Sequence, residues 1–289
     1  MDPDQLAIAN VLLGNRPYQA ALEFAFAAGE WEVCASACRI AVTGGDFQTF
    51  VDGTPLPAFA TATLRRGQRL TIGAAPDAVW GYLAVAGGFD LPPQFGSLST
   101  HSRSGIGGFG GRALTSGDEL PLAAERVTPW GERRIAPPAR GSGPIGLVLG
   151  PQAERFTPAA VETLLNAEYR IDRRSDRMAY RLDGPGLTHR DGHDIVSDGT
   201  VPGSIQVPGS GVPLVLMRDC QTTGGYPKIA TVITIDLPRL AQLRPGAALR
   251  FRALGVTEAQ ALRRRHVMRL ERLLRIVPYL GELHSPTTT

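Results

Sequence analysis

The segment from residue 221 to 229 carries the side chains best suited to chemistry in this sequence. It offers an amide, two hydroxyl groups, two adjacent glycines and an ammonium group, which together could grip an amide and a phosphate or carboxylate. The residues are Gln221, Thr222, Thr223, Gly224, Gly225, Tyr226 and Lys228. Asp219, just before the segment, could orient Lys228 or act as a base. A polar hairpin turn is the alternative interpretation of the same residues.

A second candidate is the glycine-rich run from Gly105 to Arg112. It resembles a nucleotide-binding loop, but no strand directly precedes it and no helix follows, so the dinucleotide interpretation fails. Closely spaced glycines could still present backbone N–H groups to an anion, with Arg103 and Arg112 supplying charge. The alternative is a tight connection between strands with two surface arginines.

Other polar groups give weaker signals. Asp176 and Arg177 lie between two expected strands, where pairing with each other is favoured over binding substrate. His189 and His193 lack a third ligand at metal-site spacing, so we expect a surface loop and no metal site. His101 is a weak acid-base candidate. The phosphate-loop, nucleophile-elbow and zinc signatures are absent.

Composition narrows the class of protein. The 289 residues are 43% apolar and 20% charged, with 34 Gly and 23 Pro, which is typical of a turn-rich β protein of two domains. A net charge of +3 without a basic, aromatic surface does not indicate nucleic-acid binding. Three cysteines form no disulfide framework, and no apolar run suits a signal core or a membrane span. We therefore expect a cytoplasmic protein that does not enter a membrane.

Local patterns predict the elements that must position these groups. Helices are expected at 3–13 and 157–166, and an amphipathic helix with many arginines is expected to begin near Thr257. Its arginine face is interpreted as solvated, with partner binding as the alternative. Strands are expected at 40–43, 47–51, 69–74, 80–86, 145–149, 169–172, 178–182, 212–217 and 229–237. A long loop at 87–117 separates the strand at 80–86 from a domain boundary near Pro144.

Six motifs in the same order resemble one known family. They are Tyr82–Asp90, Gly96–Thr100, Gly107–Arg112, Ser175–Met178, Ile205–Pro208 and Gln221–Lys228. The chain resembles the biotin-dependent carboxyltransferase, allophanate hydrolase subunit 2 and KipA family, whose standalone members include 5-oxoprolinase subunits of the C type. The resemblance implies a mainly β fold of two cyclophilin-like β-barrel domains with a few short helices. The expected limits are 1–143 and 144–253, followed by a helical tail at 254–289.

The resemblance also implies an activity that needs other chains. The first expectation is a subunit of an ATP-dependent amidohydrolase that opens 5-oxoproline to glutamate, inactive alone. Its partners are then a KipI-like sister subunit and a LamB-like third subunit, with ATP and Mg acting at the level of the complex. One alternative is a carboxyltransferase component acting on urea or a similar amide, with biotin on another protein, since this chain has no attachment site. The other is a KipA-type regulatory binding protein.

Roles carried over from the family fall on the polar groups already described. Lys228, Gln221 and Asp219 are the expected catalytic residues, with Lys228 and backbone N–H groups stabilising negative charge. The expected substrate-binding residues are Gln206, Thr222, Thr223, Gly224, Gly225, Tyr226, Asp176, Arg177, Arg103 and Arg112. Relatives usually begin with a further stretch containing a Gln-Asp-Gly-Arg-like motif, so the resemblance also implies that the first domain lacks its first strand.

Overall fold

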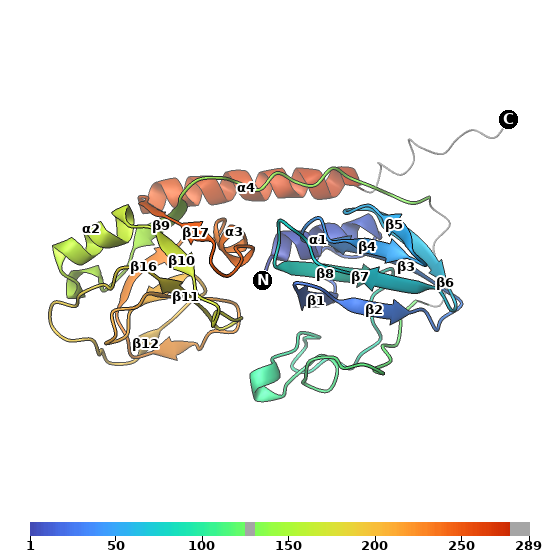
Figure 1. Ribbon diagram of the computed structural model, residues 1–289, viewed down its shortest axis with the longest axis horizontal. Coiled ribbons are helices and arrows are strands. Elements are labelled where there is room, and N and C mark those ends of the chain that lie inside the picture. Colours follow the sequence, from blue (N-terminus) through green and yellow to red (C-terminus); the bar gives the residue numbers. More distant parts are fainter. Residues whose placement is uncertain (125–130, 278–289) are drawn as a thin grey trace. The chain divides into compact units, whose positions relative to one another are not determined.

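The computed structural model describes residues 1–124 and 131–277, which fold as two compact units. The N-terminal unit comprises Asp2–Pro138 and the chain from Leu270, and the C-terminal unit comprises Ala139–Arg269 together with Met1. Strands outnumber helices in both units (Figure 1). The prediction of a mainly β chain with a few short helices is confirmed.

The N-terminal unit begins with helix α1 (Pro3–Leu12), close to the predicted 3–13. Asp2 is its N-cap and accepts a hydrogen bond from the backbone N–H of Gln5 at 3.3 Å. Pro3 fits the first turn because its missing N–H has no helical partner to lose. The sequence therefore specifies where this helix starts.

Two four-stranded antiparallel sheets follow. Their strand orders are β1-β8-β3-β6 and β2-β7-β4-β5. The strands are β1 (Leu22–Ala25), β2 (Gly29–Glu32), β3 (Ala37–Thr43), β4 (Thr49–Val51), β5 (Thr54–Leu56), β6 (Thr61–Arg65), β7 (Arg69–Ile72) and β8 (Trp80–Val85). The strands predicted at 40–43, 47–51, 69–74 and 80–86 overlap β3, β4, β7 and β8, and the last three predictions extend one or two residues past the observed strands.

Strand β3 is buried on both faces, and its side chains alternate between two apolar clusters. Ile40 and Val42 join one cluster, and Ala41 between them joins the other. The cluster of Ile40 also contains Ile72 of β7, so it joins the two sheets. Successive side chains of a strand point to opposite faces, so β3 contributes to an apolar cluster on each face.

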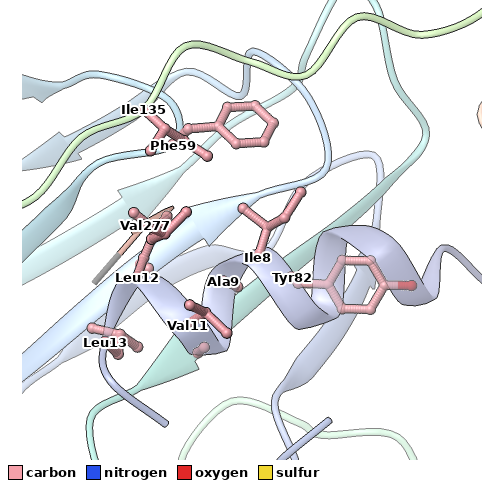
Figure 2. Close-up of a cluster of buried hydrophobic side chains, with 11 residues drawn as sticks. Ile8, Ala9, Val11, Leu12, Leu13, Phe59, Tyr82, Ile135 and Val277 are labelled. Carbon is pink, nitrogen blue, oxygen red and sulfur yellow. The ribbon is translucent and has the colours of Figure 1, made fainter. Parts of the chain in front are cut away.

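Helix α1 packs on the other face of the first sheet (Figure 2). Ile8 and Leu12 of the helix share a buried cluster with Tyr82 of β8 and with Val277, near the end of the described chain. The Tyr82 hydroxyl accepts a hydrogen bond from the backbone N–H of Asp2 at 2.6 Å, which ties the helix start to the sheet. The core of this unit therefore combines both ends of the described sequence.

One eight-stranded, nearly closed barrel sheet organises the C-terminal unit, in the order β17-β10-β11-β14-β13-β16-β9-β18. Its neighbours are antiparallel except the parallel pair β9 and β18. The strands are β9 (Ile145–Leu149), β10 (Tyr169–Ile171), β11 (Ala179–Asp183), β13 (Ser204–Gln206), β14 (Leu214–Leu216), β16 (Lys228–Val232), β17 (Ala248–Leu249) and β18 (Phe251–Ala253). A separate two-stranded ribbon pairs β12 (Asp198–Gly199) with β15 (Thr223–Gly224).

The helices of the C-terminal unit are α2 (Pro158–Asn166), α3 (Leu237–Ala241) and the first part of α4 (Val256–Ile276). Each unit also has one short 3-10 helix, η1 (Ser102–Ser104) in the N-terminal unit and η2 (Ala153–Arg155) in the C-terminal unit. Helix α2 confirms the prediction at 157–166, with Thr157 as its N-cap. The predicted strand at 229–237 is wrong in its second half, because β16 ends at Val232 and α3 starts at Leu237. Pro238 lies in the first turn of α3, where it fits a helix and cannot donate to a sheet.

The predicted C-terminal helix is confirmed as α4, which begins at Val256, one residue before Thr257. Leu273 and Leu274 pack against the α1 cluster of the N-terminal unit. The predicted helical tail extends to residue 289, and its part from 278 onward lies outside the described residues. Within the described chain, no helix combines the length and hydropathy needed to cross a lipid bilayer.

Candidate functional site

Lys228 starts strand β16 and lies opposite Gln206, the last residue of β13. A register shift between Ile205 and Gln206 interrupts the pairing there, which is a common device for re-aiming side chains at the edge of a ladder. Lys228 and Gln206 are almost completely buried, at 3% and 2% exposure. Polar groups buried to this extent need partners, so their contacts define the site.

The β12–β15 ribbon lies close to this pair. Asp198 of β12 is the register partner of Gly224 in β15. A Cβ atom on Gly224 would lie 2.4 Å from Nε2 of Gln206, so a side chain there would collide with the buried amide. Any side chain at position 224 would therefore have to displace the Gln206 amide from its hydrogen bonds.

Asp198 is the ion-pair partner of Lys228. The Lys228 Nζ atom lies 2.8 Å from Oδ2 of Asp198, which also accepts from Nε2 of Gln152 at 3.1 Å. The backbone N–H of Gly199 donates to the other carboxylate oxygen at 2.8 Å. Hydrogen bonds from Lys228, Gly199 and Gln152 lower the pKa of Asp198, so the carboxylate stays ionised at neutral pH.

Gln152 joins the strand and the ribbon from a third segment. Its Oε1 atom accepts from the backbone N–H of Lys228 at 3.1 Å, while its Nε2 atom donates to Asp198. One amide thus holds both members of the ion pair. No local pattern points to Gln152 or Asp198, because they are 76 and 30 residues from Lys228 along the chain.

The two predicted glutamines do meet. Gln221 donates from Nε2 to Oε1 of Gln206 at 3.1 Å, and Gln206 donates to the backbone carbonyl of Tyr226 at 3.4 Å. The Thr200 hydroxyl donates to the backbone carbonyl of Gln221. Gln206 is therefore the buried support, and Gln221, whose residue is exposed, is the amide that a ligand can reach.

The remaining residues of the segment lie at the surface. Thr222 and Thr223 are exposed, and Tyr226 is 40% exposed. The backbone carbonyls of Thr222 and Gly225 accept from Thr200 and Ile195, at 2.9 Å each. These bonds fasten the segment to the β12 region, so the polar turn is a structured edge of the C-terminal unit.

Lys228 is also the only lysine in the sequence, so 29 of the 30 basic residues counted as Lys or Arg are arginine (30 minus 1). Its ammonium group is compact and carries three donors, unlike the planar fork of a guanidinium. The composition therefore contains a signal for this residue beyond its motif.

Asp219 has a different partner from the one expected. Its carboxylate accepts two hydrogen bonds from Arg177, at 2.9 Å from Nε and 3.1 Å from Nη2. The expectation that Asp219 orients Lys228 is therefore wrong, because Asp198 does so. Asp176 uses Oδ1 to accept from the backbone N–H groups of Met178 and Ala179, at 2.8 and 3.2 Å, which fixes the turn before β11.

The glycine-rich loop belongs to the N-terminal unit, whereas residues 152, 198, 206, 221 and 228 belong to the C-terminal unit. Arg112 forms a bidentate pair with Asp118, with both distances 2.7 Å, and lies over the Phe109 ring. The backbone N–H of Gly107 donates to Oε1 of Gln94, and the backbone N–H of Gly111 donates to the carbonyl of Gly107. These contacts within the loop favour the alternative interpretation, a tight connection with arginines at the surface, over an anion site.

Arg103 lies in η1. His101, the residue directly before η1, contacts the Ser104 hydroxyl through Nδ1 at 2.9 Å. In the C-terminal unit, Nε2 of His189 lies 2.9 Å from the carbonyl of Val207, and its ring stacks at a tilt on Phe156. Across residues 1–124 and 131–277, no three His, Cys, Asp or Glu side chains are grouped to hold a metal ion.

This arrangement can recognise the amide group of a ligand by hydrogen bonds. The ionised carboxylate of Asp198 accepts, the amide of Gln221 both donates and accepts, and the hydroxyl groups of Thr222 and Thr223 are reachable nearby. The buried cation of Lys228 holds the acceptor in place. Such a set suits an amide better than a phosphate, since the charge that faces solvent is negative.

Two bacterial proteins resemble the chain over most of its length, and both are C subunits of 5-oxoprolinase. The protein from Haemophilus influenzae is 37% identical over 278 residues, which cover 96% of this chain and 89% of that protein. The protein from Escherichia coli is 35% identical, with 90% and 83% covered.

Solved structures show the same fold within a larger protein. The crystal structure of Kluyveromyces lactis urea carboxylase matches with a TM-score of 0.83 and 25% identity, over 94% of this chain. This chain spans about a quarter of that protein, since 26% of it is covered. The family of the carboxyltransferase domain, subdomains A and B, matches residues 1–253. This chain therefore belongs to the carboxyltransferase domain family, with α4 lying beyond the matched region.

Proposed function

We propose that this chain is one of the subunits of an ATP-dependent 5-oxoprolinase, which opens 5-oxoproline to glutamate together with partner subunits. The observation that carries this proposal is the 35–37% identity to two 5-oxoprolinase C subunits over nearly the whole chain. The polar cluster supports it, because a lactam is a small amide with one N–H donor and one carbonyl acceptor.

The reaction breaks the ring C–N bond of the lactam and adds water across it, while a second water cleaves ATP to ADP and phosphate. A lactam is a poor electrophile, and orientation of its amide plane lowers the barrier by fixing the reacting geometry. We assign the recognition of that amide plane to Gln221 and Asp198. Gln206 and Lys228 hold these two groups from the buried side.

ATP is assigned to the complex and not to this chain. The glycine-rich loop does not fit a triphosphate, because Arg112 is paired with Asp118 and the N–H groups of Gly107 and Gly111 are already bonded within the loop. No step through ATP is therefore placed on these residues. The proposed partners are the KipI-like sister subunit and the LamB-like third subunit. The three cysteines are free thiols in this structure, which agrees with the reducing cytoplasm as the proposed location.

Reconstitution tests the proposal. The chain is co-expressed with candidate KipI-like and LamB-like subunits, and ATP-dependent release of glutamate from 5-oxoproline is measured with each of the three chains omitted in turn. Activity that needs all three chains supports the proposal. A stable complex that contains this chain and releases no glutamate contradicts it and favours a regulatory binding protein.

A second candidate is a carboxyltransferase component acting on urea or a similar amide. The observation that favours it is the TM-score of 0.83 to the urea carboxylase structure. Biotin-dependent consumption of bicarbonate by the same complex, with urea as acceptor, distinguishes this reaction from glutamate release.

A further inference from the structure

The Lys228–Asp198 pair is asymmetric in its access to solvent. The lysine side chain is 4% exposed and the aspartate side chain is 53% exposed. A ligand that approaches the β12–β15 ribbon from solvent therefore meets the carboxylate before the ammonium group. The site therefore presents a hydrogen-bond acceptor, the carboxylate, to the ligand, and the ammonium group lies on its buried side.

The hydrogen bonds of Asp198 leave it able to bind a further donor. An ionised carboxylate has about four acceptor positions. Among the described residues, Lys228 and Gln152 donate to Oδ2 and Gly199 donates to Oδ1. Oδ1 thus receives one donor where it can accept two, and it belongs to the exposed side chain of the pair.

We infer that Asp198 is the residue that binds the substrate, by accepting the amide N–H of the lactam, and that Lys228 is a positioning residue that acts through Asp198. This inference rests on the proposed function and reverses the roles that the motif alone suggests. It assigns the site a ligand class, an amide with a free N–H, and it predicts discrimination against ligands with oxygen in that position.

The test compares 5-oxoproline with its lactone analogue, 5-oxotetrahydrofuran-2-carboxylate, in the reconstituted complex. The analogue replaces the N–H by a ring oxygen, which repels a carboxylate and cannot donate to it. We expect the lactone to inhibit with a Ki about tenfold to hundredfold above the KM for 5-oxoproline, the range for one hydrogen bond to a charged group. In Asp198→Asn this ratio falls to within about threefold, because the amide of asparagine also offers a donor.

A further variant separates positioning from direct contact. If Lys228 acts through Asp198, the double variant Asp198→Asn/Lys228→Gln has the same lactam-to-lactone ratio and the same kcat/KM as Asp198→Asn alone. It also contains no unpaired buried charge, so it reports on the site even where the single variant folds poorly. Far-ultraviolet circular dichroism and assembly with the partner subunits confirm folding of each variant.

The outcomes are distinct from those of the proposed function. Wild-type hydrolysis with an unchanged lactam-to-lactone ratio in Asp198→Asn overturns the inference and leaves the 5-oxoprolinase assignment standing. A further loss of tenfold or more in the double variant also overturns it, because Lys228 then touches the substrate itself. A wild-type complex without any hydrolysis overturns both.

Discussion

The Nζ atom of Lys228 lies 2.8 Å from Oδ2 of Asp198, and the two residues come from different parts of the C-terminal unit, a barrel strand and the two-stranded ribbon. The pair therefore fastens the ribbon to the barrel. Because one member is buried and the other is exposed, a change in Lys228 should be detected in the titration of Asp198.

The first prediction concerns that titration. Lys228→Gln removes the ammonium group, so the pKa of Asp198 should rise toward the ordinary carboxyl value of 3.8. In the wild type the lowered pKa contributes stability that is present above that ordinary value and is lost as the pH falls through the lowered one. Carbon-detected NMR of the carboxyl group over pH 2–6 measures the midpoint in both proteins.

Asp118 is the internal control for this experiment, since Arg112 lowers its pKa and the substitution does not touch that pair. Its midpoint should stay low in both proteins. Equal Asp198 midpoints in the wild type and in Lys228→Gln would show that the ion pair is absent in solution.

The second prediction uses the adjacent glycines of the ribbon. Gly224→Ala places a Cβ atom 2.4 Å from Nε2 of Gln206, so we expect a loss of about 1–3 kcal/mol in the free energy of unfolding. Gly225→Ala is the matched control, because its nearest neighbour is the Ile195 carbonyl at an ordinary 3.5 Å. Urea unfolding of both variants measures the difference, and equal losses would contradict the close approach of the ribbon to Gln206.

The third prediction addresses the glycine-rich loop. Gly107 and Gly110 both have positive φ, at 78° and 69°, so alanine strains the backbone at either position by about 1–2 kcal/mol. Only at Gly107 does the new Cβ collide, 2.0 Å from the Ser99 carbonyl, whereas Gly110 has open space. Gly107→Ala should therefore destabilise the protein by at least about 1 kcal/mol more than Gly110→Ala. Thermal unfolding compares them, and a larger loss at Gly110 contradicts the described loop geometry.

The fourth prediction concerns Ile276, the last residue of α4, and Val277, which follows it. Val277 is completely buried in the α1 cluster, whereas Ile276 beside it is 44% exposed. Val277→Asp buries an unpaired carboxyl group, and we expect it to destabilise the N-terminal unit by about 3 kcal/mol or more. Ile276→Asp should change the free energy of unfolding by about 0.5 kcal/mol or less.

Hydrogen exchange measured on α1 checks this prediction, because loss of packing at Val277 should speed exchange in residues 3–12. Unchanged protection of α1 in Val277→Asp would mean that the end of the helix does not contribute to that core. The Ile276 variant controls for the added charge.

Much of the fold could be predicted where a local pattern is strong. Asp2 and Pro3 specify the start of α1, and Thr157 does the same for α2, because caps and first-turn prolines act within a few residues. The predicted strand at 229–237 is wrong beyond Val232, because two local signals conflict there. Its β-branched residues continue past Val232, but Pro238 suits a helix start.

Only some residues of the candidate site could be predicted from the sequence. The motif identified Lys228, Gln221 and Gly224 because they lie in one short segment of unusual composition. Asp198 lies in the two-residue strand β12 and Gln152 in the turn before η2, and nothing in their sequence neighbours distinguishes them from other polar residues. Asp219 was selected for its closeness in sequence, yet its carboxylate binds Arg177.

The sequence by itself determined the mainly β class, the caps of α1 and α2, the polar segment at 221–229 and the resemblance to the carboxyltransferase family. All of these depend on residue types at short spacing. Only the tertiary structure decided that Asp198 holds Lys228 and that the lysine is buried while the carboxylate is reachable. Ion pairing and burial depend on which distant segments meet, and the pairing of β12 with β15 and of β13 with β16 brings these segments together.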